Sequence, residues 1–249
     1  TKIDRDKNNQ PEFTSHSFGV TEDKYFYPAS TIKLQVAALS LEKLNQIASI
    51  DKDTFLKIQP GFGSLEGETV DITAKNGIPT IGHYLHKLFV VSDNDAFNRL
   101  YEFLGPGYIN SRMWELGFPN TRIRHRLSLS LTERENQFAN AFQFYSDSGI
   151  VFEKPSQKMG LELDSPFEDF FLGDSHYVMG EKVGGPMDFS EKNFMSIPDQ
   201  HKFLIQLIFP NKNNSVNHLS LTESDREFIV NKMSMLPRNS THPKYDSKF

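Results

Sequence analysis

Two short motifs in this sequence combine the side chains that a serine-based acyl transfer requires. Residues 30–33 (STIK) place a hydroxyl and an amine three positions apart, on one face of a helix. Residues 92–94 (SDN) supply a second hydroxyl and an amide. A serine hydroxyl needs a base to become a nucleophile, and a lysine amine held neutral by burial is such a base. The motifs therefore predict an acyl-transfer site formed by Ser30, Lys33, Ser92 and Asn94.

The S-x-x-K pattern occurs three times, beginning at Ser30, Ser40 and Ser49. Pro28 disfavours a helical conformation at the residue before it and suits a helix start, so we expect a helix over residues 30–47. The free backbone N–H groups and the positive dipole end at such a start favour developing negative charge. Ser40 falls in the body of that helix and Ser49 at its end. Only the first of the three patterns therefore predicts a nucleophile.

The second motif interrupts two apolar stretches, residues 81–91 and 95–104, that both have helical spacing. A short polar segment between two helices is presented by a rigid scaffold, as many catalytic loops are. By itself the string Ser-Asp-Asn between two helices is more often a helix cap than a catalytic site. Its combination with residues 30–33 favours the catalytic interpretation.

The motifs and their surroundings resemble the first two signatures of class A β-lactamases and penicillin-binding proteins, S-x-x-K and S-D-N. The similarity is carried by residues 27–33 and 90–96, and it continues through residues 104–107 and 114–123. Residues 221–233 are also similar to the helix that this family places before its third signature, K-T-G.

The resemblance implies an α/β fold of the β-lactamase and transpeptidase type, in which a mostly helical subdomain lies beside an antiparallel sheet. It also implies a serine hydrolase that forms an acyl-enzyme on Ser30 with a β-lactam or a related amide. Lys33 would take the Ser30 proton. Ser92 would pass a proton to the leaving nitrogen, while Asn94 would orient Lys33 and bind a substrate amide oxygen. The Ser30 backbone N–H would form half of an oxyanion hole.

The sequence departs from the family at the residue that activates the deacylating water. Counted from Thr121, the family's glutamate corresponds to Leu127. Glu133 and Glu135 are the remaining candidates for that base, if an insertion returns one of them to the site. Residues 127–131 alternate apolar and polar side chains and predict a strand instead of the family's loop. Three functions stay open: a β-lactamase, a D,D-peptidase or penicillin-binding type with slow deacylation, and a non-catalytic binding domain that retains the fold.

The third signature is not found at its expected place. The nearest string is Lys182-Val183-Gly184, which Pro186 follows closely and which precedes residues 221–233, so it predicts the edge of a hairpin. We therefore expect a fragment truncated at both ends, with the K-T-G strand and the other C-terminal strands beyond Phe249.

We expect residues 1–249 to form a single catalytic domain in four parts. Residues 1–27 would supply sheet strands, 28–148 the helical subdomain with both motifs, 149–200 an insertion atypical of the family, and 201–249 helices leading to the absent strand. Strands are predicted at 13–20 and 24–27. Helices are predicted at 30–47, 81–91, 95–104, 108–116, 136–146, 201–209 and 221–233.

Composition excludes several other classes of protein. With 249 residues, of which 37% are hydrophobic, the chain can bury a large core. No apolar run reaches the roughly 18 residues of a membrane span. The net charge of −5 gives no reason to expect nucleic acid binding. The absence of cysteine excludes thiol catalysis and disulfides, and is compatible with export.

No cofactor or metal is expected. His83 and His86 share a helical face, but no third ligand stands at a matching distance, so an ordinary structural pair is favoured. The basic cluster at residues 122–126 fits a structural ion-pair network better than an anion pocket for a substrate carboxylate. From the resemblance we expect a periplasmic or exported monomer that acts on a small molecule or a peptidoglycan peptide.

Overall fold

The computed structural model describes residues 1–20, 25–62, 65–158, 160, 163–210 and 218–246. Its helices are η1 (Ala29–Ile32), α1 (Lys33–Asn45), α2 (Ile81–Val90), α3 (Asn94–Leu104), α4 (Pro106–Glu115), α5 (Glu133–Asn136), α6 (Ile197–Ile208), α7 (Glu223–Met233) and η3 (Pro237–Asn239). Its strands are β1 (Lys2–Arg5), β2 (Pro11–Thr14), β3 (Phe55–Gln59), β4 (Phe138–Ala139), β5 (Ala141–Ser146), β6 (Gly149–Lys154), β7 (Gln157–Lys158), β8 (Phe171–Leu172), β9 (Ser175–Val178), β10 (Glu181–Gly184) and β11 (Met187–Asp188).

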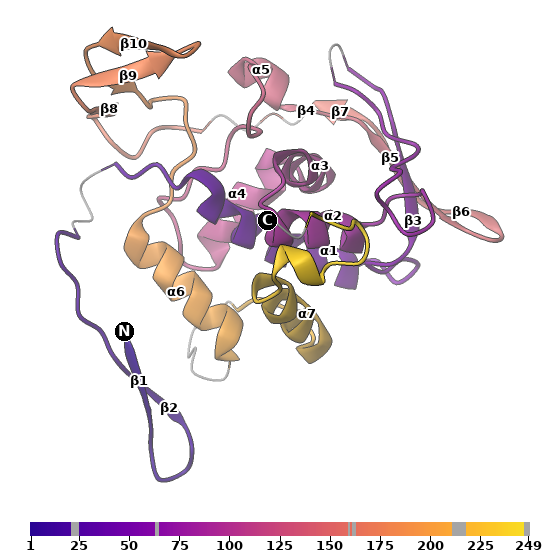
Figure 1. Cartoon of the computed structure of the whole chain (residues 1–249), viewed down its shortest axis with the longest axis horizontal. Helices are drawn as coiled ribbons and strands as arrows, with labels where there is room; N and C mark the ends of the chain where they lie inside the picture. The colour runs from indigo at the N-terminus through magenta and orange to yellow at the C-terminus, as the bar shows by residue number, and fades with distance from the viewer. Residues whose placement is uncertain (21–24, 63–64, 159, 161–162, 211–217, 247–249) are drawn as a thin grey trace.

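Helix α1 lies at the centre of the helical body, where it contacts α2, α3 and α7 (Figure 1). Apolar side chains occupy all of its faces, which is the pattern of a helix enclosed by other elements. Those that are fully buried include Val36, Ala37, Ala38, Leu39 and Leu41. Lys33 begins this helix, and it is only 4% exposed.

Local signals set the ends of the helices around α1. The Thr80 side chain accepts a hydrogen bond from the His83 N–H at the start of α2. Asp93 caps α3 by accepting from the Ala96 N–H at 2.8 Å. Gly105, with φ of 84°, ends α3 and allows α4 to begin directly at the following proline. The predicted helices at 30–47, 81–91, 95–104 and 108–116 are therefore present, with small changes at their ends.

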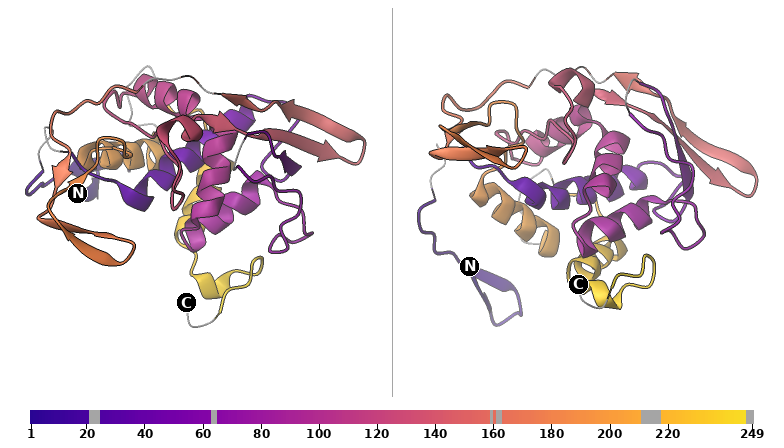
Figure 2. Two further views of the ribbon diagram at one scale, coloured as in Figure 1. Left: turned by 90° about the horizontal axis from the view of Figure 1, so that it is seen from above. Right: turned by 45° about the horizontal axis from the view of Figure 1, so that its top comes forward.

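A three-stranded antiparallel sheet in the order β3-β5-β6 flanks the helical body (Figures 1 and 2). Phe142 and Phe144 on β5 are fully buried, with ring centroids 5.7 and 5.8 Å from that of Phe103 on α3. The helix predicted at 136–146 is therefore wrong. Its aromatic spacing also fits a strand whose alternate residues face the core, and pairing with β3 and β6 selects the strand.

Other predicted strands also differ from the structure. Strand β2 overlaps only the start of the strand predicted at 13–20, because the N-terminal hairpin pairs β1 with β2. In the strand predicted at 24–27, Lys24 lies outside the described residues, and residues 25–27 are not in a strand. Residues 127–131 form a loop instead of a strand. The span 28–148, predicted as a helical subdomain, also contains β3, β4 and β5.

Residues 165–194 pack against the segment that leads to Ser30. The Tyr25 hydroxyl donates to the Asn193 carbonyl oxygen at 2.7 Å, and its ring lies among the rings of Phe167, Phe170, Phe189 and Phe194. Strand β10 contains residues 182–184 and pairs with β9, so the predicted hairpin at this string is confirmed. The region predicted as an atypical insertion thus supports the start of η1.

None of the helices in the described part of the chain combines the length and the apolar character that a membrane crossing requires.

Candidate active site

The Lys33 amine joins the two motifs. Its Nζ donates to the Ser92 Oγ at 2.9 Å and to the Asn94 Oδ1 at 2.6 Å, and also to the Ser92 carbonyl oxygen. An ammonium group has three N–H donors and no acceptor, so these three oxygens satisfy the charged form completely. The structure therefore brings together Lys33, Ser92 and Asn94.

The loop between α2 and α3 is held in the conformation that allows these contacts. Ser92 has φ of 56°, a left-handed conformation that is uncommon for a residue with a side chain. Asp93 follows in an extended conformation and caps α3, which begins at Asn94. Strained backbone of this kind persists where the surroundings fix it, and it is concentrated at functional sites.

Burial changes the acid-base behaviour of Lys33. Removal from water disfavours the ammonium form and lowers the pKa of Lys33 to about 8, although the nearby Asp93 carboxylate opposes the shift. An amine with this pKa has a substantial neutral fraction near neutral pH. Lys33 can therefore accept a proton in a way that an exposed lysine cannot.

Ser30 lies one turn before Lys33, in the short helix η1. Its backbone carbonyl accepts from the Lys33 N–H, and its side chain is exposed. Ala29, directly before it, has φ of 47°. Among the described residues no hydrogen bond joins the Ser30 hydroxyl to the Lys33 amine, whose hydrogen bonds are with Ser92 and Asn94. In structures without substrate, catalytic hydrogen bonds are often long or not yet formed.

The other two S-x-x-K serines differ from Ser30. Ser40 is fully buried inside α1, where its hydroxyl donates to the Val36 carbonyl oxygen at 2.8 Å. Ser49 lies beyond the end of α1. Of the three, only Ser30 combines a helix start with an exposed hydroxyl.

Leu127 occupies a closely defined place beside α3. Its backbone N–H donates to the Asn98 Oδ1 at 2.7 Å, and its carbonyl oxygen accepts from the Asn98 Nδ2 at 2.9 Å. The following residue, Ser128, accepts from the Asn94 Nδ2 at 2.7 Å and has φ of 56°. A serine hydroxyl thus touches the site in the segment where the family would place its glutamate. The sequence motifs did not identify Ser128, and its position directly after Leu127 was the only signal.

Glu133 and Glu135 are engaged away from Lys33. Glu133 forms an ion pair with Arg124. Glu135 accepts from the Thr132 N–H at 2.8 Å and from its hydroxyl at 2.7 Å, completing a capping box at the start of α5. Neither carboxylate has a hydrogen bond to Lys33 or to residues 92–94 in the described part of the chain.

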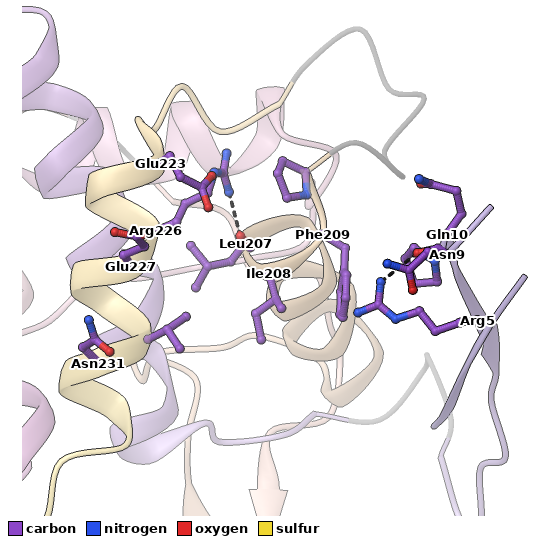
Figure 3. A pocket seen from close by; sticks show the side chains of 13 residues that line it. Arg5, Asn9, Gln10, Leu207, Ile208, Phe209, Glu223, Arg226, Glu227 and Asn231 are labelled. Atoms are coloured by element: carbon purple, nitrogen blue, oxygen red, sulfur yellow. Dashed lines mark hydrogen bonds between the residues drawn. The ribbon is translucent and has the colours of Figure 1, made fainter.

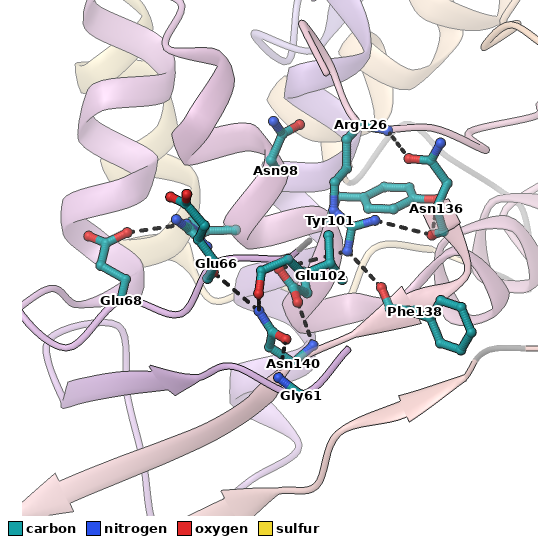
Figure 4. Close-up of polar contacts among 12 residues, drawn as sticks. Gly61, Glu66, Glu68, Asn98, Tyr101, Glu102, Arg126, Asn136, Phe138 and Asn140 are labelled. Atoms are coloured by element: carbon teal, nitrogen blue, oxygen red, sulfur yellow. Dashed lines mark hydrogen bonds and ion pairs between the residues drawn. The ribbon is translucent and has the colours of Figure 1, made fainter. Parts of the chain in front are cut away.

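The basic cluster has a structural role. Its arginines donate to backbone carbonyls: Arg122 to Pro119, Thr121 and Asp164, Arg124 to Leu163 and Ser190, and Arg126 to Asn136 and Phe138. Arg126 also lies 3.7 Å from the buried Glu102 carboxylate, and its guanidinium stands over the Tyr101 ring (Figure 4). Burial raises the pKa of Glu102, which the Arg126 charge opposes. The cluster fixes the chain around residues 122–140, as the structural alternative predicts.

A hollow of about 820 Å³ lies apart from these motifs, between the β1–β2 hairpin, the end of α6 and α7 (Figure 3). Arg226 reaches into its wall, where the guanidinium donates to the Leu207 carbonyl oxygen at 2.7 Å. Arg5 similarly donates to the Asn9 carbonyl oxygen. Its lining contains none of the residues of the two motifs, and these two arginines already have backbone partners.

No group of three or more metal-ligating side chains is found among the described residues. His83 instead lies 2.9 Å from the buried Asp71 carboxylate, and His86 lies 2.7 Å from the Ser240 hydroxyl. Both histidines have structural partners.

Comparisons with known proteins relate the chain to β-lactamases. The model of the beta-lactamase enzyme family matches residues 9–157, a span that includes Ser30, Lys33, Ser92, Asn94 and Ser128. Among solved structures, a beta lactamase from Xanthomonas campestris pv. campestris is similar, with a TM-score of 0.47 and 14% sequence identity. The alignment covers 85% of this chain and 56% of that one, so this chain spans little more than half the length of that protein. No curated protein matches the sequence.

Proposed function

The chain belongs to the beta-lactamase enzyme family, and from this premise we propose that it forms an acyl-enzyme on Ser30 with a β-lactam or a related amide. The observation that carries the proposal is the buried Lys33 amine, bonded to Ser92 and Asn94 one helical turn from an exposed serine. A base with a pKa near the working pH gives the best compromise between being unprotonated and being basic.

The proposed chemistry begins with attack by the Ser30 Oγ on the amide carbonyl carbon, while Lys33 takes the Ser30 proton. The backbone N–H of Ser30, at a helix start, donates to the oxyanion that forms. Of the two side chains, Ser92 and Asn94, that contact the Lys33 amine in the described part of the chain, Ser92 is the one that can both accept and donate a proton. It therefore passes a proton from Lys33 to the leaving nitrogen, and the C–N bond breaks to leave the Ser30 ester.

For the second half of the reaction we propose slow deacylation, of the penicillin-binding or D,D-peptidase type. Counted along the sequence from Thr121, Leu127 corresponds to the family's glutamate, and Glu133 and Glu135 are both engaged by other groups. General-base catalysis contributes roughly 10²–10⁴-fold, so a water without a positioned base attacks the ester slowly.

Intact-mass spectrometry of the complete natural protein with benzylpenicillin tests the first half. We expect one covalent adduct, which Ser30→Ala abolishes and which the matched Ser40→Ala variant retains. Equal labelling of Ser30→Ala would refute the proposal.

Nitrocefin kinetics separate the three functions that the sequence leaves open. We expect a burst of one equivalent followed by a slow steady state. Rapid turnover without a burst would indicate a β-lactamase with an unidentified base, and the absence of any reaction would indicate a binding domain.

A further inference from the structure

The contacts of Asn94 extend beyond Lys33 to a residue outside both motifs. The Asn94 Oδ1 accepts from the Lys33 Nζ, and the Asn94 Nδ2 donates to the Ser128 Oγ. We propose that Ser128 is a positioning residue for acylation, which holds the Asn94 side chain in place beside Lys33. This inference rests on the proposed function, because it assigns Ser128 a role in the step at Ser30.

The strength of the contact between Asn94 and Lys33 depends on the charge of Lys33, and this gives Ser128 its role. While Lys33 is an ammonium, its hydrogen bond to the Asn94 Oδ1 is charge-assisted and strong. When Lys33 is neutral and acts as the base, that hydrogen bond is weaker. The hydrogen bond from the Asn94 Nδ2 to the Ser128 Oγ does not depend on the charge of Lys33, so it keeps Asn94 in place in the neutral state.

The backbone supports Ser128 in this position. The Asn98 side chain forms hydrogen bonds with both the backbone N–H and the C=O of Leu127, and Asn94 lies one turn earlier on the same helix. Two asparagines of α3 therefore bind two consecutive residues: Asn98 binds the backbone of Leu127, and Asn94 binds the hydroxyl of Ser128. Ser128 is exposed, so burial does not account for its left-handed backbone conformation. A strained and exposed residue held by a motif side chain indicates a role in the site.

Two substitutions test the contact between Ser128 and Asn94, and both are compatible with the left-handed backbone at position 128. Ser128→Gly removes the hydroxyl, and glycine adopts a positive φ without strain. Ser128→Asn restores a side-chain acceptor, and asparagine tolerates the left-handed region better than other side chains. Ser130→Ala is the matched control, since Ser130 is exposed in the same loop and is not bonded to Asn94.

The measurement is the rate of labelling by a fluorescent penicillin as a function of pH, in the complete natural protein. We expect Ser128→Gly to slow labelling by roughly 2–10-fold, the value of one neutral hydrogen bond. We also expect the midpoint of its pH dependence to fall, because the Lys33 ammonium loses a fixed acceptor. Asp93, the charged group that acts on Lys33, is unchanged in this variant. Ser128→Asn should recover the rate and the midpoint, and Ser130→Ala should match the unmodified protein.

The outcomes distinguish this inference from the proposed function. Normal labelling of Ser128→Gly with an unchanged midpoint would overturn the role of Ser128 and leave the acyl-enzyme proposal intact. Slower labelling with an unchanged midpoint and no recovery in Ser128→Asn would also overturn it, since that result indicates a structural role alone. Failure of the unmodified protein to label at Ser30 would overturn both.

Discussion

The pH dependence of acylation follows from the burial of Lys33. With a pKa of about 8, roughly one Lys33 in ten is neutral at pH 7. A lysine at the ordinary value of 10.5 would be neutral in roughly one molecule in 3,000 at the same pH. Burial therefore supplies roughly 300 times more of the base form. We expect the acylation rate to rise about tenfold per pH unit below pH 7 and to level off above about pH 9.

A single substitution tests whether Lys33 causes this profile. The Asp93 carboxylate raises the pKa of Lys33 against the effect of burial, so Asp93→Asn should move the midpoint to lower pH. Asparagine is also a good helix cap, so the start of α3 should be retained. Asp95→Asn is the control, since Asp95 lies on the same helix but its charge is not among those that shift Lys33.

The assay is the second-order rate constant for labelling by a fluorescent penicillin, measured from about pH 6 to about pH 9.5. A rate that does not vary over this range would refute Lys33 as the base. So would a midpoint that Asp93→Asn leaves unchanged, or one that Asp95→Asn shifts by the same amount.

Three further predictions concern the surroundings of the site. Glu133→Gln and Glu135→Gln should leave the rate of label release unchanged, because both carboxylates are engaged elsewhere; a slower release in either would identify a deacylation base. Arg126→Met should lower the free energy of unfolding in urea by about 3–5 kcal/mol, since it removes the ion-pair partner of the buried Glu102, and an unchanged free energy of unfolding would contradict this. Tyr25→Phe removes one buried hydrogen bond and should lower the free energy of unfolding, measured by thermal denaturation, by about 1 kcal/mol. An unchanged free energy of unfolding would show that the aromatic contacts hold Tyr25 without this hydrogen bond.

The parts of the fold that could be predicted from sequence are those that local signals determine. Helices α2 and α3 have apolar periodicity and a side-chain cap, and both are found within one or two residues of the predicted ends. Pro28 before η1 similarly indicates a helix start, which the structure has at Ala29, one residue before the predicted start at Ser30. These features depend on residues that are close together in the sequence, so a sequence pattern is enough to predict them.

The errors occur where distant contacts decide between two conformations. The aromatic residues of β5 fit a helix by spacing, but β3, far earlier in the chain, offers a pairing partner that the pattern does not contain. Residues 127–131 alternate apolar and polar side chains as a strand does, yet they form a loop, in which the Asn98 side chain binds the backbone N–H and C=O of Leu127. Ser128 was missed for the same reason, because its contact with Asn94 exists only in the folded chain.

The contact between Tyr25 and Asn193 has a consequence for folding, because it joins residues that are 168 positions apart. Chains are synthesised from the N-terminus, and contacts between distant residues form late because closing the loop between them is unfavourable. The Lys33 contacts with Ser92 and Asn94 join residues only 59 and 61 positions apart. The anchoring of the segment before Ser30 must wait until residues 189–194 have emerged and folded. We therefore expect the segment before Ser30 to be anchored later in folding than Lys33 meets Ser92 and Asn94.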